Sequence, residues 1–175
     1  FIPVVGNILV PIAGVRLASP ELSWFFFSIG LVFWIVLLTI VLYRLFFHEP
    51  LPVRLTPTLF ILLAPPSVGF IAYLQLSNGL DAFARILYYT ALFLALLLAS
   101  NAVRFLRTPF FISAWAYSFP LAALTIATLV MSTRQPGPVF TLLGLGLLTM
   151  VSLVVAALTV RTLVAVGRRQ ICAPE

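Results

Sequence analysis

The sequence predicts an all-α integral membrane protein made of helical hairpins, with kinked inner helices around a pore and straight outer helices. Of its 175 residues, 63% are hydrophobic and 8% are charged, which leaves too little polar surface to cover a water-soluble body. The apolar residues fall in long runs, and internal prolines fall in alternate runs. The composition and the long apolar runs place the chain in a membrane, and the prolines in alternate runs suggest how its helices are arranged.

The charged residues exclude several classes of function. The net charge is +6 and every basic residue is an arginine. In so apolar a chain, this excess marks loops on the cytoplasmic side of a membrane rather than a nucleic-acid surface. Cys172 and His48 are each the only residue of their type, which excludes a disulfide framework and a metal-ligand cluster. We therefore expect no metal, no cofactor and no nucleic-acid partner. We also expect no enzymatic activity, because no nucleophile has a base within the spans.

Six segments are long and apolar enough to cross, or nearly cross, a hydrocarbon layer, which takes about 20 helical residues. They cover about residues 2–15, 22–47, 57–76, 80–103, 110–131 and 138–167. We expect residues 1–175 to form a single transmembrane domain. Because the chain opens at Phe1 without a methionine and its first segment is short, we expect it to be the C-terminal portion of a longer chain.

Each later segment carries its own signals. The second is long enough to cross with tilt, and it bears Trp24 where an interfacial aromatic belt would lie. At the start of the fourth, Asp81 is a favourable anion that can pair with Arg85 at i,i+4. A Gln-Pro-Gly-Pro turn at 135–138 separates the fifth from the sixth. The sixth is about 45 Å long if wholly helical, so Arg161 lies at or beyond the interface.

The arginines predict the orientation of the chain. One side collects those of the even-numbered connections and the tail, namely Arg44, Arg54, Arg104, Arg107, Arg161, Arg168 and Arg169. The other side has Arg16, Arg85 and Arg134. Seven against three predicts that the C-terminus is cytoplasmic.

Prolines interrupt the first helix of every hairpin and none of the second helices. Pro11 lies in the first segment, Pro65 and Pro66 in the third, and Pro120 in the fifth. An internal proline removes an i→i−4 hydrogen bond and kinks the helix, and the freed carbonyl must then be satisfied by protein or water. We therefore expect kinked inner helices against a wet passage and straight outer helices. The alternative is that proline and glycine are simply common in membrane helices.

Small and polar residues follow the same division. They gather on the proline-containing segments, whereas Leu, Ile, Val and Phe dominate the middles of the second and fourth. We expect the passage to be lined by Gly6, Asn7, Gly14, Ser67, Gly69, Ser113, Tyr117 and Thr128. Three inner helices alone would pack shut, so further hairpins or several copies are needed to enclose a lumen.

Two stretches resemble a known family. Residues 1–7 (FIPVVGN) and 110–120 (FFISAWAYSFP) are similar to the fifth and ninth helices of the tellurite-resistance/dicarboxylate transporter family, which includes bacterial TehA-like proteins and plant slow-type anion channels. The resemblance implies ten helices in five hairpins, of which this chain would supply helices five to ten. It also implies an anion channel or transporter of a bacterial inner (plasma) membrane, a link to tellurite resistance, and a homotrimer with one pore per subunit.

In the channels of that family, a phenylalanine of the ninth helix plugs the lumen. Phe110 and Phe111 are about 100° apart on a helix, so only one of them can point inward. Phe110 shares its face with the smaller, more polar residues Ser113 and Tyr117, whereas Phe111 shares its face with the bulky Trp115. We predict that Phe110 is the gate and that Phe111 is the alternative. A third possibility is that both rings only fill packing space.

The predicted function is passive conduction of small inorganic or organic anions. A lining of hydroxyls, amides and helix dipoles binds an anion weakly enough to release it. One alternative is proton-coupled carriage of C4-dicarboxylates or sulfite. Coupling usually needs titrating groups within the membrane, whereas Asp81, Glu21 and Glu49 lie at helix ends or in loops. A non-conducting membrane assembly subunit is the alternative from another class.

Overall fold

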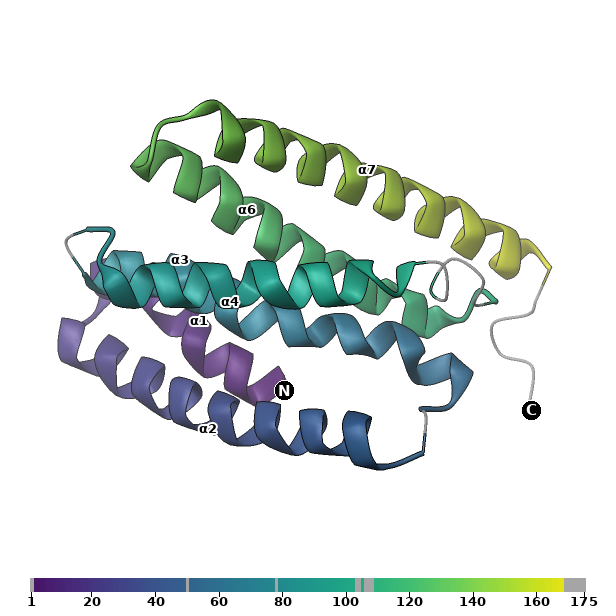
Figure 1. Cartoon of the computed structure of the whole chain (residues 1–175), viewed down its shortest axis with the longest axis horizontal. Coiled ribbons are helices and arrows are strands. Elements are labelled where there is room, and N and C mark those ends of the chain that lie inside the picture. Colours follow the sequence, from purple (N-terminus) through teal and green to yellow (C-terminus); the bar gives the residue numbers. More distant parts are fainter. Residues whose placement is uncertain (1, 50, 78, 103–104, 106–108, 169–175) are drawn as a thin grey trace.

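The computed structural model describes residues 2–49, 51–77, 79–102, 105 and 109–168, and within these ranges it contains helices and no strands. Figure 1 shows helices running back and forth along one direction. In chain order they are α1 (Ile2–Leu17), α2 (Pro20–Phe47), the 3-10 helix η1 (Val53–Leu63), α3 (Ala64–Leu76), α4 (Ala82–Ala99), the 3-10 helix η2 (Ile112–Tyr117), α6 (Ser118–Arg134) and α7 (Pro138–Gly167).

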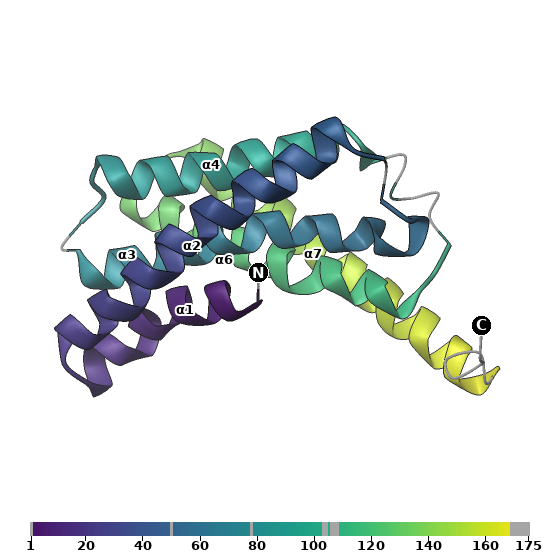
Figure 2. The same cartoon turned by 90° about the horizontal axis from the view of Figure 1, so that it is seen from below.

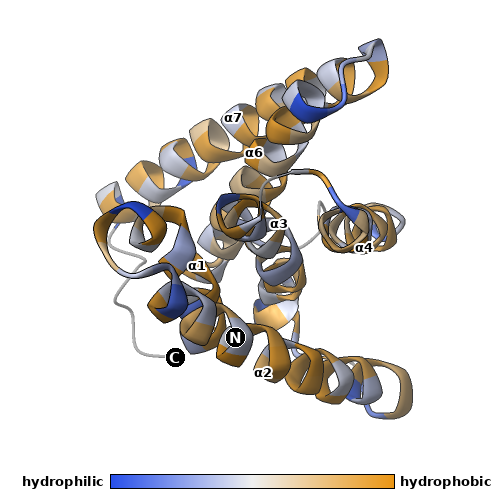
Figure 3. Ribbon diagram, turned by 90° about the vertical axis from the view of Figure 1, so that its left-hand side faces the viewer, coloured by the Kyte–Doolittle hydropathy of each residue, from blue (hydrophilic) through white to orange (hydrophobic). Residues whose placement is uncertain are grey.

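Among the described residues, five helical stretches are long and apolar enough to cross a membrane. They are α2, η1 with α3, α4, η2 with α6, and α7. Hydrophobic residues dominate every helix, and the strongly hydrophilic ones lie mainly near helix ends and connections (Figure 3). α1 has 16 residues and covers only part of the length of the helix formed by η1 and α3 (Figures 1 and 2). The predicted all-α membrane class is confirmed.

α3 lies at the centre of the molecule and contacts α1, α4 and α6. Burial follows the proline prediction for the third and fifth predicted spans but not for α1, where 4 of 16 residues are buried against 6 of 18 in α4, which was expected to be an outer helix. In the most apolar part of Val53–Leu76, 61% of the residues are buried, against 11% in α7 and 17% in α2. α2 packs on α1 and α7 packs on α6, so these two outer helices present most of their surface away from the protein.

Small residues let each of these outer helices approach its inner partner closely. The buried residues of α2 are Ser23, Phe27, Gly30 and Trp34, a spacing of four and three that forms one stripe. The buried residues of α7 lie seven apart, at Gly144, Val151, Leu158 and Ala165. A Cβ atom at Gly144 would lie 2.7 Å from the Leu129 side chain. Glycine at this position therefore sets how closely α7 can pack on α6.

Two inner helices change their winding where prolines occur. Pro65 and Pro66 are the second and third residues of α3, and Pro120 is the third residue of α6. The ring of a proline clashes with the carbonyl four residues earlier in an α-helix, and at both places the turn before the proline is 3-10 rather than α. The expected spans 57–76 and 110–131 are each built of two parts, 3-10 and then α. Pro11, in contrast, lies inside α1, which is one continuous α-helix from Ile2 to Leu17, so the break predicted at this proline is wrong.

The described arginines sit near helix ends in the predicted grouping. Arg16 and Arg134 lie in the last turns of α1 and α6, which end at one side of the molecule. Arg44 lies in the last turn of α2, which ends at the opposite side. Arg104, Arg107 and Arg169 fall outside the described residues.

Candidate functional site

The two 3-10 segments pack against each other, one before each broken inner helix. The hydroxyl of Ser113 in η2 donates to the backbone carbonyl of Arg54 in η1 at 2.6 Å. The indole Nε1 of Trp115 donates to the hydroxyl oxygen of Thr162 in α7 at 3.0 Å. Side chains of η2 thus bond to both η1 and α7, at the end of the molecule where α2 and α7 end (Figure 1).

An aromatic cluster fills the space between the same two segments. The ring of Tyr117 in η2 lies edge-on to Phe60 of η1, with centroids 4.7 Å apart. Phe105 packs edge-on to Phe60 at 5.0 Å and also faces Tyr117. Edge-to-face pairs at these distances are favourable beyond the area that they bury. The predicted lining residue Tyr117 is therefore half-buried within a packed cluster.

The two gate candidates precede η2 and are both half-buried. Phe111 is extended, with φ −123° and ψ 157°, and Phe110 lies outside any helix. The sequence argument placed both on one α-helix about 100° apart. That premise is wrong here, because neither residue lies in a helix. The choice between the two phenylalanines stays a prediction.

The predicted lining residues of α1 are at least partly accessible. Gly6 is exposed, and nothing lies within 4 Å of the place where a side chain would start. The Asn7 side-chain amide donates to the Pro3 carbonyl at 2.9 Å, one turn earlier. Gly14 instead faces α2, because a Cβ atom there would lie 2.7 Å from the hydroxyl oxygen of Ser23.

Three predicted lining residues are buried in the present arrangement. Ser67 is 0% exposed and its hydroxyl has no hydrogen-bond partner. Gly69 lies against the side chains of Ile8 and Leu87. Thr128 is 0% exposed and donates to the Leu124 carbonyl at 2.9 Å. These positions form the packed centre of the described chain.

Tyr88 is a central residue that the sequence reasoning missed. It belongs to α4, yet it is 0% exposed, and its hydroxyl lies 3.4 Å from the Thr128 oxygen of α6. Its ring also packs against Phe70 and Phe140. A tyrosine within an otherwise apolar span was the available signal, since a buried tyrosine hydroxyl normally finds a partner.

At the opposite end of the molecule, Asp81 caps α4. Its carboxylate accepts from the Ala84 amide at 2.8 Å and from the Tyr73 hydroxyl at 2.5 Å. These two bonds lower the pKa of Asp81, the amide bond most. The expected ion pair with Arg85 does not form: the carboxylate of Asp81 binds the Ala84 amide and the Tyr73 hydroxyl, and Arg85 donates to the Gln135 side chain at 2.9 Å.

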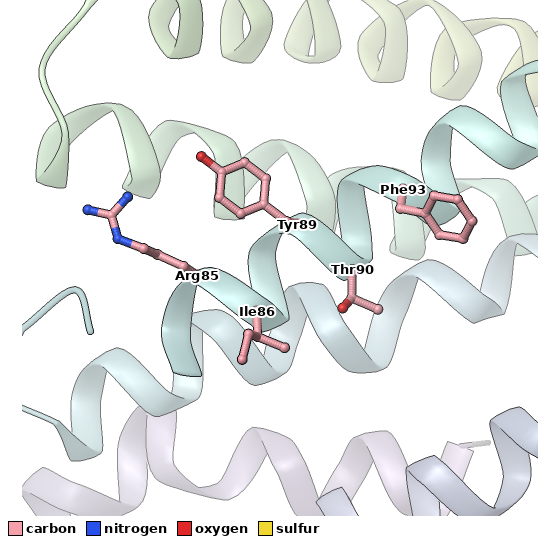
Figure 4. A pocket seen from close by; sticks show the side chains of 5 residues that line it. All are labelled: Arg85, Ile86, Tyr89, Thr90 and Phe93. Atoms are coloured by element: carbon pink, nitrogen blue, oxygen red, sulfur yellow. The ribbon is translucent and has the colours of Figure 1, made fainter. Parts of the chain in front are cut away.

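A surface hollow of about 420 Å³ lies along α4 (Figure 4). Its lining residues are Arg85, Ile86, Tyr89, Thr90 and Phe93, and all belong to this one helix. It is therefore separate from the contact between η1 and η2. Among the residues that the structure describes, no three His, Cys, Asp or Glu side chains come close enough to hold a metal ion.

The sequence matches the SLAC1 family, described as "Voltage-dependent anion channel", over residues 1–163. The chain belongs to this family. It is 32% identical to the S-type anion channel SLAH3 of Arabidopsis thaliana over 92% of the chain and 25% of that protein. It is 29% identical to the guard cell S-type anion channel SLAC1 of the same plant, over 91% of the chain and 29% of that protein.

An archaeal relative is also similar. The uncharacterized transporter MJ0576 of Methanocaldococcus jannaschii is 28% identical over 84% of the chain and 49% of that protein. The chain therefore spans from a quarter to about half the length of these relatives. These matches bear out the resemblance to the transporter family that includes the plant slow-type anion channels.

Proposed function

We propose that this chain is part of a multi-pass membrane protein that conducts small anions passively through a pore. The observation that carries the proposal is the meeting of the two broken inner helices at η1 and η2, next to Phe110 and Phe111. Irregular backbone at membrane depth is tolerated only where protein or water satisfies it. The names of the plant relatives, S-type anion channels, favour an anion as the permeating species.

The charge of the inner helices suits an anion. None of α1, η1, α3, η2 and α6 contains an acidic residue, so no carboxylate within them repels a permeating anion. Their arginines, Arg16, Arg54 and Arg134, lie at helix ends. There they can raise the local anion concentration without trapping the ion. Chloride, nitrate and other small anions fit this chemistry equally well.

The gate and the lining belong to the same proposal. Phe110 closes the passage as a bulky apolar ring, and Phe111 is the alternative. The lining comprises Gly6, Asn7, Gly14, Ser67, Gly69, Ser113, Tyr117 and Thr128, with breaks at Pro65, Pro66 and Pro120. Since Ser67 and Thr128 are fully buried, they would face the passage only after the inner helices separate. We also propose a bacterial inner-membrane location with a cytoplasmic C-terminus, a homotrimer, and a link to tellurite resistance.

Planar-bilayer recording of the purified full-length protein tests the proposal. In a salt gradient, the reversal potential should lie near that of the anion. Phe110→Ala should raise the anion current severalfold, while Phe111→Ala, the matched control, should change it less. A cation-selective current, or no current, would refute conduction of anions. If Phe111→Ala raised the anion current more than Phe110→Ala, the gate would be Phe111 rather than Phe110.

A coupled anion carrier is the second candidate, because the archaeal relative is named a transporter. Uptake of radiolabelled anion into proteoliposomes, with and without a pH gradient, separates the two candidates. A proton-coupled carrier accumulates its substrate against the substrate's own gradient, whereas a channel only equilibrates it. Accumulation driven by the pH gradient would therefore replace the channel proposal.

A further inference from the structure

η2 and α6 are two parts of one span whose winding changes at Ser118. A 3-10 helix turns about 120° and rises about 2.0 Å per residue, and an α-helix turns about 100° and rises about 1.5 Å. If the six residues of η2 rewound as α-helix, its start would turn by about 120° relative to α6 and move by about 3 Å. Phe110 and Phe111 directly precede that start, so this change would displace them most.

Two side-chain hydrogen bonds oppose such rewinding. Trp115 lies three residues before α6, so its side chain would turn by about 60° away from Thr162. Ser113 lies five residues before α6, and it would turn by about 100° away from the Arg54 carbonyl. Both donors would leave their acceptors in η1 and α7. The two bonds are thus compatible with the 3-10 winding and incompatible with the α winding.

Pro120 acts in the same direction. In a continuous α-helix its ring would crowd the carbonyl of Ala116, four residues earlier. The α winding of η2 is therefore a state of higher energy, and the neighbouring hydrogen bonds add to the difference. A minor state a few kcal/mol above the major one is the usual basis of a two-state switch.

We propose that the hydrogen bond between Trp115 and Thr162 is a latch that holds η2 in its 3-10 winding and keeps Phe110 in the closed position. Releasing the latch lets η2 rewind and moves Phe110 out of the passage. Trp115 and Thr162 are positioning residues that act through Phe110. The inference rests on the proposed function and adds to it how the gate is held.

The chain offers a matched pair of variants for the test. Thr162→Val removes the acceptor for Trp115 and keeps the shape of the side chain. Thr159→Val is the control, because Thr159 is exposed on the same helix and its hydroxyl bonds to the Val155 carbonyl of its own helix at 2.9 Å. Trp115→Phe removes the donor from the other side. If Thr162→Val does not fold, Trp115→Phe alone tests whether this hydrogen bond is a latch.

Single-channel recording of the full-length protein separates a latch from a merely structural contact. Thr162→Val and Trp115→Phe should raise the open probability about two- to tenfold, the factor that one hydrogen bond contributes. The unitary conductance should stay unchanged, and Thr159→Val should behave as the wild type. In a Phe110→Ala background, Thr162→Val should add nothing, since the two changes would act through the same gate.

A second readout does not depend on conduction. Isotope-edited infrared spectroscopy with ¹³C-labelled alanine carbonyls in Ala114 and Ala116 reports the winding of η2. Thr162→Val should shift these bands toward the α-helical frequency, and Thr159→Val should not. If Thr162→Val and Thr159→Val have the same band position and the same open probability, the latch is refuted. If the wild type carries no anion current, the proposed function fails, and the infrared comparison still decides whether the bond holds the winding.

Discussion

Replacing Gly30 by alanine tests whether close approach of α1 and α2 stabilises the molecule. A Cβ atom at Gly30 would lie 2.6 Å from Ile8 Cγ1, and 3.0 Å from both the Ile8 nitrogen and the Val4 carbonyl oxygen. Two of these three atoms are backbone, so the helices must separate rather than one side chain turn away. Overpacking of this kind costs about 1–3 kcal/mol, and alanine returns about 0.5–1 kcal/mol through its helix propensity. Taking the middle of both ranges, we expect Gly30→Ala to lower the free energy of unfolding by about 1 kcal/mol.

Gly146→Ala is the matched control. Gly146 lies within α7, is exposed, and has nothing within 4 Å of a Cβ atom. Alanine there should raise the free energy of unfolding by about 0.5–1 kcal/mol. Thermal unfolding in detergent, followed by circular dichroism and by the fluorescence of the tryptophans, measures both variants. If Gly30→Ala were as stable as Gly146→Ala, then the close contact between α1 and α2 would contribute nothing to stability.

Two further predictions concern the cap of α4 and the passage between the inner helices. Asp81 has a lowered pKa in the folded state, so its stabilising effect is complete at neutral pH and is lost as the pH falls below the ordinary carboxyl value of about 3.9. In that range the melting temperature of the wild type should fall more steeply with decreasing pH than that of Asp81→Asn. Parallel plots of melting temperature against pH for the two proteins would contradict this prediction. In a Cys172→Ser background, cysteines that replace Asn7 and Ser113 should react with a membrane-impermeant thiol reagent. A cysteine that replaces Phe33, which is exposed on the outward face of α2, should not react. The reverse order of reactivity would refute a wet passage between the inner helices.

Much of the fold follows from local chemistry that the sequence displays. The apolar runs predict the spans, because about 20 apolar residues in a helix match the thickness of the hydrocarbon layer. Pro65, Pro66 and Pro120 predict two irregular spans, since the ring of a proline crowds the carbonyl four residues earlier in an α-helix, whereas Pro11 lies in the continuous helix α1. What they do not predict is the form of the irregularity. Either a kink or a 3-10 segment relieves the clash, and the structure has 3-10 segments, which pack against each other.

The side-chain contacts of the candidate site could not be predicted from the sequence. Serines and threonines on the proline-containing helices indicate a polar inner layer, but not which hydroxyl meets which partner. Ser113 reaches Arg54, 59 residues away in the chain, and Tyr88 reaches Thr128 from a helix that the sequence assigned wholly to the outer layer. No local pattern records such contacts, because they depend on how helices distant in sequence are placed side by side.

The sequence by itself determined that this chain is a helical membrane protein, that the spans containing Pro65, Pro66 and Pro120 are irregular, and where its charges lie, since each follows from transfer free energy and backbone sterics within a short window. Only the tertiary structure decided that Phe110 and Phe111 precede a 3-10 segment rather than lie on an α-helix, and that Trp115 bonds to Thr162. The physical reason is that η2 contacts η1 and α7, which are distant in the sequence and whose positions are set by packing across the whole molecule.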